Sequence, residues 1–410
     1  METLFFEVST PVLRELANPD VGTVPRVAVG ATSFRPLAAL LIAALALRPQ
    51  LVGLGPLLPA IQGDLGVSHT LAGLLTTVPV LCMALFALPA VRLAHRIGLR
   101  NAMTGALATI TIFGVLRALA PSYALILVAT IGIGIGIAVG GALLPRAVRI
   151  MVPARTGFAT GLYSGGIQTG AAIAAATAAP LAILVDWRFA LAVFSVGVAF
   201  ILAGWLATTR SLPRMPSAAE RPRIPWGSTA AWRMTAIFAL HSLCYYGLIT
   251  WLPTAFVDAG WTEESAGRLV AILNLSCLPA TLTIPWLSDR ATSRHRYILV
   301  AGVITTLAIA GIELVPAAVV VWVIVGGLAL GALFPLSMTM PIDVGQDRVA
   351  GHAAMMLAGG FGLAAVAPAL LGWVRDATGS FDVAFWILAA ASAILCLLAV
   401  RRLGSNMRAA

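Results

Sequence analysis

The chain has 410 residues, of which 60% are hydrophobic and only 10% are charged. A soluble domain carries about 25% charged residues, so this composition disfavours a cytosolic enzyme, a nucleic-acid binder and a secreted domain. The formal net charge is +10, but the basic residues are all arginines in short clusters between long apolar runs. That arrangement is not the pattern of a surface that binds nucleic acid.

The first 34 residues contain four acidic side chains and no long apolar core. We predict that residues 1–34 form a disordered cytoplasmic tail and not a signal peptide or a membrane span. Twelve apolar runs follow, each close to the roughly 20 residues that a membrane-crossing helix needs. They lie near 36–60, 69–91, 101–119, 122–147, 157–184, 189–209, 231–256, 265–287, 297–314, 317–341, 353–374 and 383–401. The sequence therefore predicts an all-α integral membrane protein with twelve transmembrane helices.

A basic, proline-rich segment after the sixth run divides the chain into two similar parts. Gly141-Ala-Leu-Leu-Pro145 in the fourth run recurs as Gly331-Ala-Leu-Phe-Pro335 in the tenth. Pro59 in the first run has a counterpart in Pro253 of the seventh, at a similar offset. Parallel repeats of this kind are an arrangement of secondary transporters. We expect two six-helix pseudo-repeats at 35–209 and 230–402, a cytoplasmic linker at 210–229 and a cytoplasmic tail at 403–410.

The arginines support this map through the positive-inside rule. With the N-terminus in the cytoplasm, 21 arginines lie on the cytoplasmic side and four on the outer side, namely Arg117, Arg188, Arg268 and Arg375. Arg48 belongs to neither side. We therefore predict a multi-pass protein of the bacterial inner membrane, with both termini in the cytoplasm and the lipid bilayer as its surroundings.

The loop after the second run carries a family motif. It reads Val91-Arg-Leu-Ala-His95-Arg96-Ile-Gly98-Leu-Arg100-Asn101. This resembles the signature loop of the major facilitator superfamily, Gly-x-x-x-Asp-Arg-x-Gly-x-Arg-Arg, and keeps Arg96, Gly98 and Arg100. His95 stands where the family has aspartate, whereas the second copy of the motif keeps Asp289 and Arg290. The resemblance implies that these residues belong to a loop that latches one conformation of the transporter, and it leaves the effect of His95 open.

A narrower resemblance covers most of the membrane region. Leu47-Arg48-Pro49 in the first run and Leu144-Pro145, followed by Thr160-Gly-Leu-Tyr163-Ser164, are similar to the cyanate and 2-nitroimidazole transporter branch of the superfamily. This resemblance implies a transporter of small, often anionic, solutes that is not an enzyme and needs no cofactor. His241-Ser242 departs from the pattern of that branch, so the solute is not settled by the resemblance.

Arg48 is the strongest functional signal in the sequence. It lies 13 residues after Arg35, which at 1.5 Å per helical residue is roughly 20 Å into the membrane. A guanidinium at that depth needs water or a partner, and no carboxylate lies at a comparable depth in the map. The planar guanidinium suits a small anion, so the substrate itself is the predicted counter-charge. The alternative is that Arg48 caps backbone carbonyls freed by Pro49.

Other polar groups in the runs are candidates to contact the substrate. His241 titrates near physiological pH, so it is a candidate substrate donor or proton carrier, or alternatively a histidine satisfied by the backbone. The remaining candidates share a position inside an apolar run and are Gln50, Tyr163, Gln168, Tyr245, Tyr246 and Asn274. Interhelical hydrogen bonding is the alternative for each of these. The four cysteines lie in apolar runs without metal-ligand spacing, so no metal site is expected.

Together these features predict a secondary active transporter that moves a small molecule by alternating access. We expect the substrate to be a small anion resembling cyanate, the coupling ion to be the proton, and the protein to be a monomer that binds no nucleic acid. Two alternatives remain open. One is an efflux antiporter for nitroimidazole-like or drug-like compounds, and the other is a membrane sensor that transports nothing.

Overall fold

The computed structural model describes residues 35–152, 155–210, 223–289, 294–341 and 348–400. The predicted tails at 1–34 and 403–410 lie outside the described residues, as does most of the predicted linker. Every regular element in the described part of the chain is helical. Twelve candidate membrane spans are present, beginning at Arg35 and ending at Val400. The predicted all-α fold with twelve spans is therefore confirmed.

Among the first six spans, the first is broken and each of the other five is a single helix. Spans two to six are α5 (His69–Ile97), α6 (Leu99–Leu119), α7 (Tyr123–Met151), α8 (Thr156–Leu184) and α9 (Trp187–Thr208). Short polar residues begin some of these helices: the Ser68 hydroxyl caps α5 and the Asp186 carboxylate caps α9. Gly98 separates α5 from α6 with φ of 86°, a left-handed backbone that favours glycine. This explains the glycine of the loop motif.

The last six spans begin with the longest unbroken helix, α10 (Thr229–Asp258). The others are α11 (Glu263–Asp289), α12 (Arg294–Leu314), α13 (Val319–Thr339), the pair α14 (Val349–Ala364) and α15 (Val366–Thr378), and α16 (Asp382–Val400). Within the described residues we call the end of the spans at which α9 stops and α10 starts the linker end, and the opposite end the far end. The positive-inside argument predicts that the linker end is cytoplasmic.

The first span is broken, whereas α10, its predicted repeat counterpart, is continuous. It consists of α2 (Arg35–Leu45), the single turn α3 (Pro49–Val52), the 3₁₀ turn η1 (Gly55–Leu57) and α4 (Leu58–Leu65). Pro49 has no backbone N–H, so it cannot bond the carbonyl of Leu45, and a proline disrupts a helix at this point. At Gly55 a Cβ would overlap the Ile249 carbonyl oxygen of α10. The broken span therefore packs directly against α10.

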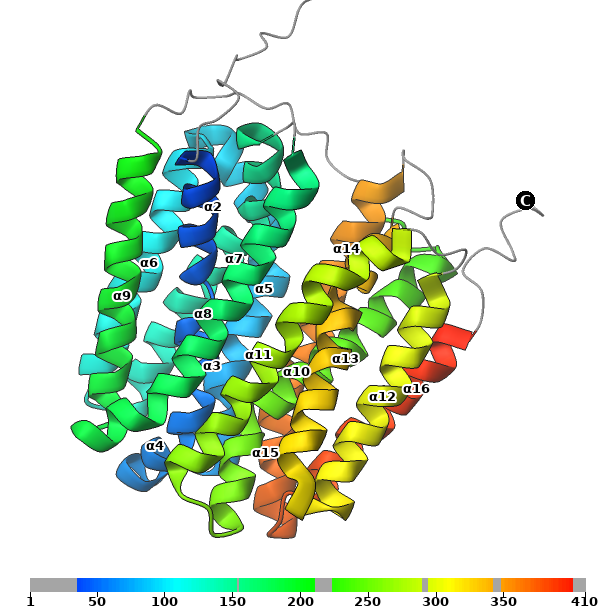
Figure 1. Cartoon of the computed structure of the whole chain (residues 1–410). Helices are drawn as coiled ribbons and strands as arrows, with labels where there is room; N and C mark the ends of the chain where they lie inside the picture. The colour runs from blue at the N-terminus through cyan, green and yellow to red at the C-terminus, as the bar shows by residue number, and fades with distance from the viewer. Residues whose placement is uncertain (1–34, 153–154, 211–222, 290–293, 342–347, 401–410) are drawn as a thin grey trace, which may run out of the picture. The chain divides into compact units, whose positions relative to one another are not determined.

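Besides this contact of the first span with α10, helices of the first six spans contact helices of the last six along two further seams. The helix α11 packs against α8, while α14 and α15 pack against α5 (Figure 1). At the far end, Asp376 of α15 accepts hydrogen bonds from the backbone N–H groups of His69 and Thr70 at 3.0 and 2.8 Å. It also accepts one from the Thr70 hydroxyl at 2.6 Å and lies 2.8 Å from Nδ1 of His69. We call Asp376, His69 and Thr70 the far-end latch, because they join the two groups of spans.

Candidate substrate site

The break in the first span sets the position of Arg48. This residue precedes Pro49 and occupies the N-cap of α3, so its side chain leaves the chain where regular helix is absent. The side chain is half-buried. Its Nη1 donates a hydrogen bond to the Tyr246 hydroxyl at 2.9 Å. The guanidinium carbon also lies 5.7 Å from the ring centroids of both Tyr245 and Tyr246. Arg48 therefore connects the first span to α10.

The surroundings of Arg48 are neutral. Among the described residues, no carboxylate lies within 4 Å of its guanidinium. A tyrosine hydroxyl and two ring faces stabilise a cation in part, but they do not neutralise its charge. A guanidinium carries five N–H donors, and the described protein groups accept from one of them. The site can therefore accept an anion through the remaining donors.

A backbone carbonyl beside Arg48, that of Gln50, is capped by another arginine. Leu54 donates its backbone N–H to Leu51, which leaves the Gln50 carbonyl outside the helical pattern. Arg117 Nη2 donates to that carbonyl at 2.9 Å and to the Gln50 Oε1 atom at 2.5 Å. The sequence placed Arg117 on the outer side. Its helix does end at the far end, but the side chain is 0% exposed and turns into the protein.

Gln50 points away from Arg48 and into the first six spans. Its amide nitrogen donates to the Ser195 hydroxyl at 2.8 Å, and its carbonyl oxygen accepts from Arg117. Gln50 and Ser195 are 1% and 0% exposed. Both ends of the amide thus have protein partners, so the structure does not bring Gln50 to the Arg48 site as the sequence predicted.

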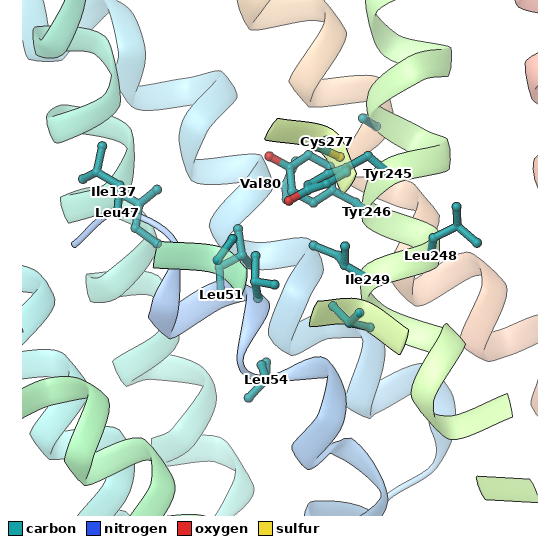
Figure 2. Packing of buried hydrophobic residues seen from close by; sticks show 14 of the residues in the cluster. Leu47, Leu51, Leu54, Val80, Ile137, Tyr245, Tyr246, Leu248, Ile249 and Cys277 are labelled. Atoms are coloured by element: carbon teal, nitrogen blue, oxygen red, sulfur yellow. The ribbon is translucent and has the colours of Figure 1, made fainter. Parts of the chain in front are cut away.

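The two tyrosines on α10 lie close to several residues that the sequence predicted to contact the substrate. Tyr245 donates its hydroxyl hydrogen to Asn274 Oδ1 at 2.8 Å, and the two tyrosine rings meet edge to face at 5.3 Å. Figure 2 shows both rings grouped with Val80 and Cys277. Gln168 of α8 lies beside Cys277 of α11. Helices α5 and α11 therefore contact the tyrosines that bind Arg48, through Met83 and Asn274, and α8 contacts α11 beside them.

His241 lies one turn before Tyr245 on the same face of α10. It is 4% exposed and packs 6.4 Å from the rings of Phe238 and Phe334. Its Nδ1 is buried and has no hydrogen-bond partner among the described residues. No contact joins His241 to Arg48 in that part of the chain. The backbone-satisfied alternative therefore does not apply to Nδ1.

Two predicted features lie nearer the linker end. Tyr163 is half-buried in the second turn of α8, with Arg149 as a charged neighbour. Gly166 and Gly170 of the same helix lie against Leu41 and Leu45 of α2, so Tyr163, earlier in α8, lies on the linker side of the break. In the loop motif, Arg96 is exposed and Arg100 donates to the Thr209 hydroxyl at 3.3 Å. The side chain of Asp289 and all of Arg290 lie outside the described residues.

His95 of the loop motif contacts its own group of spans. Its Nε2 lies 3.1 Å from Nη1 of Arg146 on α7. Because an arginine can only donate, this nitrogen accepts the hydrogen bond. The substituted position thus forms no contact between the first and the last six spans among the described residues. The far-end latch and the hydrogen bond from the Ala369 N–H to the Thr77 hydroxyl, at 3.2 Å, are polar contacts between them toward the far end.

Arg117 and Ser195 are the polar residues that the sequence did not single out. Arg117 lies inside the predicted run 101–119, and this position was the feature of the sequence that could have indicated a buried arginine. Its position near the end of the run suggested a solvated arginine. Ser195 has no distinguishing pattern, since isolated serines are common in membrane helices. Among the described residues, no group of three or more His, Cys, Asp or Glu side chains could hold a metal ion.

Comparisons with known proteins match most of the chain. A family model described as the Major Facilitator Superfamily matches residues 39–365. The chain is 30% identical over 370 residues to the 2-nitroimidazole transporter of Escherichia coli (strain K12), covering 88% of this chain and 93% of that protein. It is 28% identical over 350 residues to the cyanate transport protein CynX of the same organism, covering 84% and 91%. It is also 28% identical over 262 residues to the "Probable nitrate/nitrite transporter NarK2" of Mycobacterium tuberculosis (strain ATCC 25618 / H37Rv), covering 59% and 63%.

Proposed function

Because the chain belongs to the Major Facilitator Superfamily, a family of membrane transporters and not enzymes, we propose that it transports a small anion bound by Arg48. The observation that carries this proposal is the half-buried guanidinium, which contacts two tyrosines and no carboxylate of the described residues. An intramembrane charge is costly unless it is compensated. A small anion would supply the compensating charge at the moment of transport.

The geometry suits a small planar or linear anion. The guanidinium presents paired N–H donors in one plane, and such pairs match two acceptor atoms of an anion. Tyr246 would share the Arg48 donors with the substrate, and the tyrosine rings would form the apolar wall. The names of two relatives, a cyanate transport protein and a nitrate/nitrite transporter, agree with this class of substrate.

We propose transport by alternating access between the first and the last six spans. Arg48 and Tyr246 belong to different groups of spans, so an anion held between them would contact both. The far-end latch joins the same two groups at the end that we propose to face the outside. In this arrangement the substrate would leave toward the linker end. We propose from the arginine distribution that this end faces the cytoplasm and that the protein lies in a bacterial inner membrane. We expect the transporter to act as a monomer.

Proton symport is the proposed mode of coupling. Uptake of an anion against an inside-negative potential costs about 2.3 kcal/mol per charge per 100 mV, and a co-transported proton would cancel this term. His241 is the proposed carrier because its Nδ1 is buried without a partner among the described residues. An inward proton gradient should therefore accelerate uptake of the anion into proteoliposomes.

The experiment that tests the function is a thermal-shift screen with cyanate, nitrate, nitrite and 2-nitroimidazole on the purified protein. The matched control for Arg48→Ala is Arg268→Ala, because Arg268 is an exposed arginine that pairs with Glu264 in its own helix. We expect an anion to stabilise the wild type and the control but not Arg48→Ala. Equal stabilisation of all three proteins would contradict the anion proposal.

A second candidate is export of a planar nitroheterocycle. Phe361 lies 6.4 Å from the Tyr246 ring and 5.0 Å from the Phe238 ring, so aromatic faces continue from the Arg48 site along α10. Aromatic rings stack favourably on planar ligands, and one relative is named a 2-nitroimidazole transporter. This candidate predicts that 2-nitroimidazole stabilises both the wild type and Arg48→Ala.

A further inference from the structure

The single helical turn that follows Arg48, α3, does not fix its own rotation about the helix axis. The helix α3 has four residues, and the chain departs from regular α-helix on both sides of it. A single helical turn is unfavourable by itself, because too few hydrogen bonds offset the ordering of its backbone. Contacts from other helices must therefore fix the rotation of α3, and with it the direction of Arg48.

A buried chain of hydrogen bonds supplies such contacts. Arg117 of α6 donates hydrogen bonds to both the backbone carbonyl and the side-chain oxygen of Gln50. The Gln50 amide nitrogen then donates to Ser195 of α9, whose hydroxyl donates to the Leu191 carbonyl at 2.8 Å. We call Arg117, Gln50 and Ser195 the buried clamp. It ties α3 to two helices of the first six spans.

The clamp and the substrate site lie on opposite faces of the same turn. Residues two apart in a helix differ in direction by about 200°, so a side chain at Gln50 points away from one at Arg48. The contacts agree: Gln50 reaches α6 and α9, while Arg48 reaches Tyr246 of α10. A rotation of α3 that frees Gln50 would therefore turn Arg48 away from Tyr246.

Gln50 is also closely packed on the side of α6. A Cβ on Gly114 of α6 would overlap both the Gln50 amide nitrogen and the Ser195 hydroxyl. Glycine at this position lets α6 approach the clamp closely, so the amide is enclosed on that side. The close fit limits the rotation of the Gln50 side chain and hence of α3.

Stability alone does not account for the clamp. Arg117 is 0% exposed, and its Nε and Nη1 have no hydrogen-bond partner among the described residues. A buried guanidinium with unused donors is costly, and a well-packed apolar pair of similar size is often as stable or more so. The hydrogen bonds of these polar groups define the rotation of α3, which contacts of an apolar pair would not do.

We infer that Arg117 and Gln50 are positioning residues that aim Arg48 at the substrate, an inference that rests on the proposed anion site. The clamp does not touch the anion. It determines the rotation of α3, so its loss should weaken anion binding while the fold persists. This assigns a role to Arg117 and replaces the substrate contact predicted for Gln50.

The test is a double-mutant cycle of Gln50→Leu and Arg117→Met, with uptake into proteoliposomes of the anion that stabilises the wild type. Gln50→Leu alone removes the side-chain acceptor of a buried guanidinium, which keeps only the backbone carbonyl of residue 50, so this variant should unfold at a lower temperature. The double variant removes both side chains of that contact and should recover part of that stability, because the backbone carbonyl of residue 50 then loses its donor. We expect its KM for the anion to rise on the order of tenfold or more, since small misplacements of a binding group have large effects. The maximal rate per folded transporter should change less.

Three further measurements make the outcome decisive. Arg117→Lys keeps one donor for the Gln50 carbonyl and should restore part of the KM. If the double variant does not fold, Ser195→Ala takes its place, because it removes one contact of the clamp and should raise the KM without lowering the maximal rate. A folded clamp variant with the wild-type KM would overturn the inference. If Arg48→Ala then still loses anion binding, the clamp inference alone has failed, whereas unchanged binding by Arg48→Ala defeats the proposed function.

Discussion

The far-end latch should control how often the far end opens. Asp376 accepts two backbone and one hydroxyl hydrogen bond from the first turn of α5, and it lies against the His69 ring. Asp376→Asn keeps the shape of the side chain but removes its charge. The carboxylate is 27% exposed, so solvent screens part of each interaction. Hydrogen bonds to charged groups contribute about 1.5–3 kcal/mol each when well buried. We therefore expect a loss of only about 2 kcal/mol for the whole set at this partly exposed site.

A loss of about 2 kcal/mol corresponds to an increase of roughly thirtyfold in the population of the far-end-open state. Thr254 of α10 offers a reporter, because it is 3% exposed and lies one turn from the far end of its helix. In a background without native cysteines, Thr254→Cys should react slowly with a membrane-impermeant maleimide. Asp376→Asn should raise the labelling rate by about the same thirtyfold, since labelling follows the open population.

The control is Asp382→Asn, which removes an exposed carboxylate from the first turn of α16. It should leave the labelling rate unchanged. An unchanged rate in Asp376→Asn would refute the reasoning that the latch holds the far end closed. A rate raised equally by both variants would show that net charge, and not the latch, is responsible.

Three more predictions concern the site and its support. Arg48→Lys keeps the charge but loses the planar pair of donors. The KM for the anion in proteoliposomes should therefore rise about tenfold, which corresponds to a loss of about 1.4 kcal/mol of binding free energy. An unchanged KM would show that the charge alone is sufficient for binding. Gly55→Ala forces a Cβ against the Ile249 carbonyl and should lower thermal stability by about 1–3 kcal/mol, whereas Gly63→Ala, in open space, should not. His241→Gln should preserve the anion-induced thermal shift but abolish acceleration of uptake by an inward proton gradient; retained acceleration would exclude His241 as the carrier.

The sequence alone determined the number and positions of the spans. The predicted run 69–91 became α5 (His69–Ile97), and 231–256 became α10 (Thr229–Asp258). Transfer of a segment from water to lipid depends on its own composition over about 20 residues, so a local reading of hydropathy is enough. The loop motif at Arg96, Gly98 and Arg100 was likewise sufficient to predict the family that the comparisons confirm.

The tertiary structure decided where the polar side chains point. Arg48 and Tyr246 are 198 residues apart, and Asp376 and His69 are 307 apart. Hydropathy gives no information on such pairs, because a hydrogen bond depends on how helices pack and on the local rotation of each backbone. The break at Pro49 was readable from the sequence, but the direction it gives to Gln50 was not. For the same reason the sequence predicted that Arg117 lies on the outer side of the membrane, although its guanidinium is buried against the turn that follows Arg48.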